Sequence, residues 1–110
     1  MGNFVKTTLH EKKNRASMIL ERIHIDVCGP FLVASTTKHR YYVIFVDDYS
    51  RRCWIFFMWK KSETFSKFCE FKALVEKESR KQVKALWSDN GGEYNSSEFK
   101  DFCSKEGIQR

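Results

Sequence analysis

The sequence has one proline and five glycines in 110 residues, and no apolar run approaches the ~18 residues that a membrane-spanning helix requires. The four cysteines show no Cys-x-x-Cys spacing, and the three histidines do not pair with them at zinc-finger intervals. The N-terminus lacks the apolar segment of a secretory signal. These absences argue against a membrane span, a zinc finger and a secreted disulfide scaffold, and they indicate reduced thiols in an intracellular protein.

Aromatic and basic residues are abundant. Hydrophobic residues make up 42% of the chain and aromatic residues 15%, which is too apolar for a disordered tail and predicts one globular domain. Lysine and arginine outnumber aspartate and glutamate by 20 to 14, a net charge of +6. This balance favours a polyanionic partner, although a solvated basic surface explains it about equally well. The basic clusters, Lys12-Lys13 with Arg15 and Lys60-Lys61, are better explained as solvated charge runs than as phosphate contacts.

The first half of the chain predicts three strands. Residues 1–20 are basic and without clear period, so we expect a flexible leader there and a folded region over residues 21–110. Residues 21–27 alternate, with Ile23 and Ile25 on one face, until Gly29 and Pro30 break the pattern. Residues 40–46 and 53–59 are nearly continuous in apolar residues, and the short link between them predicts an antiparallel hairpin.

The second half predicts a helix, a strand and a helix. Ser62 is the expected N-cap of a helix whose apolar face carries residues 65, 68, 71, 74 and 75. Residues 82–88 form a fourth strand, with Val83, Ala85 and Trp87 expected on one side. A second helix begins near residue 96 and ends at Gly107. The order predicts an α/β fold with a mixed sheet, three antiparallel strands followed by a parallel one. The last residues resemble the beginning of a further strand.

Two aspartates stand at positions that suggest chemistry. Asp26 lies on an otherwise apolar strand, and Asp89 follows the fourth strand. Each also has a structural explanation, since Asp26 suits a solvated edge and Asp89-Asn90-Gly91 suits a turn. If the first and fourth strands are parallel neighbours, the two carboxylates converge at one edge of the sheet, where a divalent cation would relieve their repulsion. Asp47 and Asp48 are rival candidates, but their hairpin setting favours a turn.

Four segments in order carry a family resemblance: "IHIDVCGP", "RYYVIFVDDYSRRCWIFF", "KSETFSKFCEFKALVE" and "SDNGGEYNSSEFKDFCSKEGI". Together they are similar to the integrase catalytic core of copia-type (Ty1/copia) LTR retrotransposons, in the retroviral integrase superfamily. The resemblance extends from about Ile23 to Arg110. It implies an RNase H-like fold and polynucleotidyl transfer to DNA by an Asp-Asp-Glu triad that holds Mg²⁺ or Mn²⁺.

On this resemblance, the first two catalytic and metal-binding residues are Asp26 and Asp89. The third carboxylate of the family would lie beyond Arg110, so whether this chain is itself an enzyme is uncertain. The expectation is a polyprotein fragment that binds metal weakly and is inactive alone. The implied partner is DNA, both retroelement ends and target, and the implied location is the nucleus. An unpaired edge on the fourth strand also predicts self-association.

Two other interpretations stay open. The residues Arg40, Tyr41, Tyr42 and Phe45 loosely resemble the aromatic sheet of an RNA-recognition domain, which would make the chain a non-catalytic nucleic-acid-binding module. The continuous apolar run around them fits a buried strand better. The sequence is equally compatible with a retroelement remnant that has no selected function.

Overall fold

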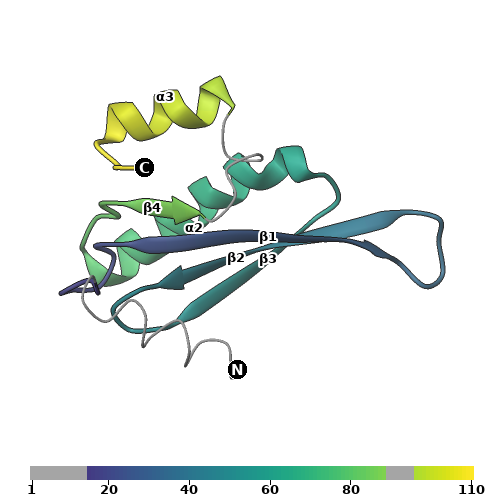
Figure 1. Cartoon of the computed structure of the whole chain (residues 1–110), viewed down its shortest axis with the longest axis horizontal. Helices are drawn as coiled ribbons and strands as arrows, with labels where there is room; N and C mark the ends of the chain where they lie inside the picture. Colours follow the sequence, from purple (N-terminus) through teal and green to yellow (C-terminus); the bar gives the residue numbers. More distant parts are fainter. Residues whose placement is uncertain (1–14, 89–95) are drawn as a thin grey trace.

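The structure, a computed structural model, describes residues 15–88 and 96–110. Its centre is a four-stranded sheet in the order β3-β2-β1-β4 (Figure 1). The strands are β1 (Ile23–Leu32), β2 (His39–Asp47), β3 (Cys53–Met58) and β4 (Leu86–Ser88). The first three are antiparallel neighbours, and β4 pairs parallel to β1. The mixed sheet predicted from the sequence is therefore confirmed.

Both helices lie on one side of this sheet (Figure 1). The helix α2 (Thr64–Ser79), which follows a short 3₁₀ turn, η2 (Lys61–Glu63), packs against the sheet through aromatic rings. Phe45 of β2 stacks on Phe71 with 4.4 Å between ring centroids. The helix α3 (Ser97–Glu106) packs on α2, where Phe99 lies 5.2 Å from Phe68. These contacts place the hydrophobic core between the sheet and α2.

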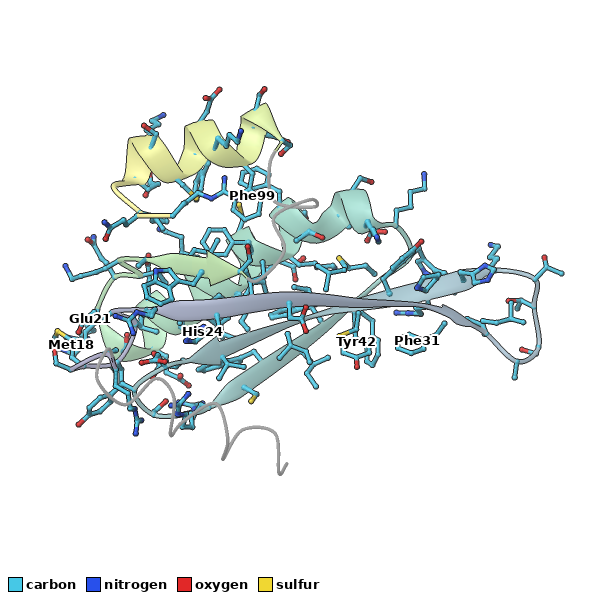
Figure 2. The ribbon with its side chains drawn as sticks, viewed as in Figure 1. Met18, Glu21, His24, Phe31, Tyr42 and Phe99 are labelled. Carbon is cyan, nitrogen blue, oxygen red and sulfur yellow. The ribbon has the colours of Figure 1, made fainter. Side chains whose placement is uncertain are left out.

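We call the opposite side of the sheet the outer face. Two rows of cross-strand partners define it: Asp26, Ile44 and Ile55, and then Cys28, Tyr42 and Phe57. Ile55 and Phe57 are 56% and 58% exposed. Figure 2 shows Tyr42 together with Phe31 on the side away from the helices, and their rings stack at 5.4 Å. Among the described residues, neither helix covers this face.

Strand β1 continues through Gly29 and Pro30, where the sequence predicted an interruption. The register with β2 shifts between Cys28 and Phe31, so the two residues form a bulge and the ladder resumes beyond it. Gly29 has a φ of +123°, and a Cβ there would meet the carbonyl oxygen of Arg40 at 2.9 Å. The glycine-proline pair therefore bends the strand without ending it.

The helix boundaries are largely as predicted, but some details differ. Ser96 caps α3 by accepting a hydrogen bond from the Phe99 amide, and Gly107 ends it with a φ of +72°. Ser62 is not an N-cap; it lies inside η2, and the Glu63 carboxylate instead accepts from the amides of Trp59 and Lys60. Leu74, predicted to face the core, is 51% exposed because α2 turns it toward solvent.

The fourth strand is shorter than predicted, and its alternation changes. Val83 and Ala85 are buried as expected, but Leu86 is buried as well and Trp87 is 42% exposed. Leu86 pairs with Ile23 in the core, so the following residue points to the outer face. Val83 and Leu86 belong to the hydrophobic core, so Trp87 does not share the buried surroundings of Val83.

Both ends of the described chain are attached to the sheet. Residues 15–20 of the expected leader contact the β2–β3 turn, and Ala16 and Leu20 are buried; residues 1–14 lie outside the described residues. At the other end, Gln109 forms a parallel bridge with Ala85 and exchanges backbone hydrogen bonds with Lys84 and Leu86. The last residues, which resemble the beginning of a strand, thus form one isolated bridge, and it occupies part of the edge next to β4.

The four residues that suggested an RNA-recognition surface do not share one face. Phe45 is fully buried, and Tyr41 packs against the core. Arg40 contacts the rings of Phe57 and Trp59, and Tyr42 belongs to the outer face. Alternation along β2 thus splits the set between the core and the opposite side, which weighs against the interpretation as an RNA-recognition sheet.

Candidate active site

Asp26 lies on the outer face of β1, one residue beyond the buried Ile25. Its cross-strand partner is Ile44. Since side chains alternate along a strand, His24, Asp26 and Cys28 project from the same side of β1. Asp26 is exposed, as a carboxylate that receives a ligand must be.

The pairing of β1 with β4 ends beside Asp26. The parallel register joins Ile23 to Leu86, His24 to Trp87 and Ile25 to Ser88. The second predicted site residue, Asp89, lies outside the described residues, so the structure does not test the expected pairing. Within residues 15–88 and 96–110, no group of three or more His, Cys, Asp or Glu side chains gathers in a way that could hold a metal ion.

Cys28 and Tyr42 are the neighbours of Asp26 along the outer face. The Cys28 thiol lies 3.8 Å from Oδ2 of Asp26. Burial raises the pKa of this thiol; the Tyr42 hydroxyl lowers it and the Asp26 carboxylate raises it again. The thiol therefore stays protonated near neutral pH and is able to donate to the carboxylate.

A buried carboxylate, Asp48, organises the end of the sheet next to this site. It accepts hydrogen bonds from Nε2 of His24 and from the Ala16 amide, both at 2.7 Å. The guanidinium groups of Arg22 and Arg51 lie 3.5 and 3.7 Å away. Burial raises the pKa of Asp48, but the Ala16 amide, His24 and Arg51 outweigh it and hold that pKa below its usual value.

Asp47 has a structural role, because its carboxylate contacts backbone amides rather than charged side chains. It is 1% exposed, and its carboxylate accepts from the backbone amides of Leu20 and Ser50 at 2.8 Å. The prediction that the two hairpin aspartates serve the turn thus agrees with the contacts, but it missed that Asp48 also binds β1. The available signals were Arg51, a cation three residues after Asp48, and His24, a polar residue on an apolar strand.

Trp87 stands beside His24 on the outer face. Its ring lies 4.1 Å from the guanidinium carbon of Arg22, and the His24 ring meets it edge-on at 6.0 Å. The neighbourhood of Asp26 thus combines one exposed carboxylate, an exposed indole and several cations fixed by Asp48.

The sequence profile of the integrase core domain matches residues 17–110. The chain belongs to the integrase core domain family. Among the curated relatives of this integrase core, the Retrovirus-related Pol polyprotein from transposon TNT 1-94 of Nicotiana tabacum is 40% identical over 108 residues, which is 98% of this chain and 8% of that protein. The Pol polyprotein from transposon RE2 of Arabidopsis thaliana is 40% identical over 94 residues, 84% of this chain and 6% of that protein.

Solved structures show the same fold. The integrase catalytic core domain of HTLV-2 in complex with magnesium has a TM-score of 0.72 at 23% identity, and the match covers 86% of this chain and 60% of that one. A simian T-cell lymphotropic virus intasome in complex with PP2A regulatory subunit B56 gamma gives 0.72 at 19% identity, covering 87% of this chain and 32% of that one. The RNase H-like fold and the resemblance to copia-type integrases are confirmed.

The relatives are much longer than this integrase core. The chain spans less than a tenth of the length of the Pol polyproteins that it matches. None of the described helices is long and apolar enough to cross a membrane. All four cysteines are free.

Proposed function

We propose that this chain is part of an integrase catalytic core that acts on DNA, with Asp26 and Asp89 as its first two metal-binding carboxylates. The observation that supports this proposal most directly is the parallel register of β1 and β4. Ile25 pairs with Ser88, and the next residue in the sequence after each of them is an aspartate, Asp26 and Asp89. In a parallel ladder, side chains at paired positions project from the same face.

The chemistry of the donors fits Mg²⁺ or Mn²⁺. Asp26 offers exposed carboxylate oxygens, the hard ligands that these ions take. When bound, such ions activate an attacking water or DNA 3′-hydroxyl and stabilise the leaving oxygen at phosphorus. Asp26 and Asp89 would hold the metal, and the buried Ile25 fixes the strand that carries Asp26.

The 110-residue chain is expected to bind metal weakly and to transfer DNA strands little or not at all. Asp26 and Asp89 match two of the three carboxylates of the family's Asp-Asp-Glu triad, and the resemblance assigns the third to none of these 110 residues. The net charge of +6 favours contact with a polyanion. DNA is therefore the proposed partner, and the proposed compartment is the nucleus.

Self-association through the β4 edge is a separate proposal, and the structure leaves less of this edge unpaired than the sequence suggested. Gln109 already pairs with the Lys84 and Leu86 backbone, so less of the β4 edge is available to a second copy. Removing residues 107–110 would expose the whole edge and increase association. Analytical ultracentrifugation of the full and shortened chains measures the difference.

A metal titration tests the proposed site. Mn²⁺ broadens the NMR signals of nearby nuclei, and the amide signals of residues next to Asp26 should broaden first. Asp26→Asn and Asp89→Asn should each weaken this effect at least about tenfold, because each removes a charged oxygen ligand. Asp101→Asn is the matched control, since Asp101 is an exposed carboxylate on α3. Equal broadening in all three variants would contradict the proposal.

A further inference from the structure

Trp87 is an exposed aromatic residue that the core does not require. It is 42% exposed, whereas its neighbour Leu86 is 3% exposed and fills the core contact of β4. Because His24 pairs with Trp87, the indole projects from the outer face, two residues along β1 from Asp26. A large apolar ring thus occupies the border of the proposed metal site.

The indole is held in place from two sides. The Arg22 guanidinium lies 4.1 Å from the centre of the ring, and the His24 ring lies edge-on at 87°. Asp48, fully buried, contacts both Arg22 and His24. One carboxylate therefore fixes both residues that flank the indole, so little side-chain freedom remains to be lost when a ligand stacks on it.

Cationic side chains lie close to this ring. Three guanidinium groups, those of Arg15, Arg22 and Arg51, contact the carboxylate or the backbone carbonyls of the Asp47–Tyr49 turn. The two carboxylates of this turn, Asp47 and Asp48, are buried, and the next carboxylate along the outer face is Asp26, the proposed metal ligand. An exposed aromatic ring beside cations is the usual surface for single-stranded nucleic acid, where bases stack and phosphates are attracted.

We infer that Trp87 stacks an unpaired nucleobase of the DNA end whose phosphate is presented at Asp26. Arg22 and His24 act as positioning residues that hold the indole, and Asp48 holds both. This inference rests on the proposed function, because it takes DNA as the ligand. It adds to that function a contact that selects a single-stranded end over a fully paired duplex.

The test measures the affinity of the 110-residue chain, by fluorescence anisotropy in Mg²⁺, for a labelled duplex with a short single-stranded end. Trp87→Ala should weaken binding about tenfold, the range of a lost base-aromatic stack, and Trp87→Phe should stay within about threefold. Trp59→Ala is the matched control: Trp59 is 44% exposed and lies 4.5 Å from the Arg40 guanidinium carbon. It should change the affinity less than about twofold.

A second probe separates stacking from general attraction. An abasic nucleotide in the single-stranded end should weaken binding to the unmodified protein by the same factor as Trp87→Ala, and should have no further effect on that variant. Equal losses from Trp87→Ala and Trp59→Ala would overturn the inference. So would a change in self-association without a change in DNA affinity, which would make the indole a protein contact.

Asp26→Asn distinguishes a failure of this inference from a failure of the proposed function. If Mg²⁺ strengthens DNA binding and Asp26→Asn removes that gain, the proposed function stands whatever Trp87→Ala does. Unchanged affinity in Trp87→Ala would then overturn the inference alone. If the unmodified chain binds no DNA at all, both are overturned. Matching circular dichroism spectra and melting temperatures of the variants show that folding does not cause the differences.

Discussion

Nε2 of His24 lies 2.7 Å from Oδ1 of Asp48 and joins the first strand to the turn between the second and third. The same carboxylate accepts a hydrogen bond from the Ala16 amide. Three segments that are distant in sequence therefore meet at one buried group. These contacts hold the beginning of β1 in place, next to the candidate metal site. The stability of the domain and the geometry of the site are therefore linked through Asp48.

Replacing Asp48 with alanine should destabilise the domain by about 3 kcal/mol, since it removes a buried carboxylate that contacts two partly buried guanidinium groups and the Ala16 amide. The side chain of Asp48 is 0% exposed, while those of Arg22 and Arg51 are 15% and 27% exposed. Urea denaturation measures the loss. Asp101→Ala, at an exposed carboxylate on α3, is the control and should cost less than about 0.5 kcal/mol. Equal effects of the two variants would show that the Asp48 contacts add no stability.

Acid should remove the contribution of Asp48. Its folded-state pKa is lowered, since the Ala16 amide, His24 and Arg51 together outweigh the effect of burial. The stabilisation is thus fully present above the unfolded-state pKa of about 3.9 and is lost as the pH falls through the lower folded-state pKa. The difference in unfolding free energy between the unmodified chain and Asp48→Asn should shrink as the pH falls below about 4. A difference that stays constant from neutral to acidic pH would refute the linkage.

The bulge in β1 should tolerate no side chain at Gly29. A Cβ at this position would lie 2.9 Å from the Arg40 carbonyl oxygen, and the φ of +123° disfavours any other residue. Gly29→Ala should therefore cost about 2 kcal/mol or more. Gly107→Ala is the matched comparison, because its φ is +72° but no atom lies within 4 Å of the added Cβ. It should cost about 1 kcal/mol, and thermal melts of both variants establish the order.

Local patterns predicted most of the fold because they depend on neighbouring residues. Alternation located β1, helical spacing located α2, and Ser96 and Gly107 marked the ends of α3. The same patterns did not show that Leu86 is the residue of β4 that enters the core, because its pairing with Ile23, a long-range contact, decides this. They also stopped β1 at Gly29, where pairing with β2 carries the strand past a bulge.

The site was predictable to a smaller extent. Asp26 was singled out because a carboxylate on an apolar strand needs an explanation; it lies exposed on the outer face, and its ligand role stays a prediction. The cluster around Asp48 escaped prediction, since its members come from residues 15–22, His24 and the β2–β3 turn. Only the folded chain brings these groups within hydrogen-bonding distance.

An experimental structure of the chain with bound Mn²⁺ tests the central claim most directly, because anomalous scattering locates the ion independently of the protein. The proposal predicts an ion coordinated at about 2.1 Å by oxygens of both Asp26 and Asp89, on the outer face of the sheet. An ion bound elsewhere, or the Asp89 carboxylate on the helix side of the sheet and away from Asp26, would contradict it.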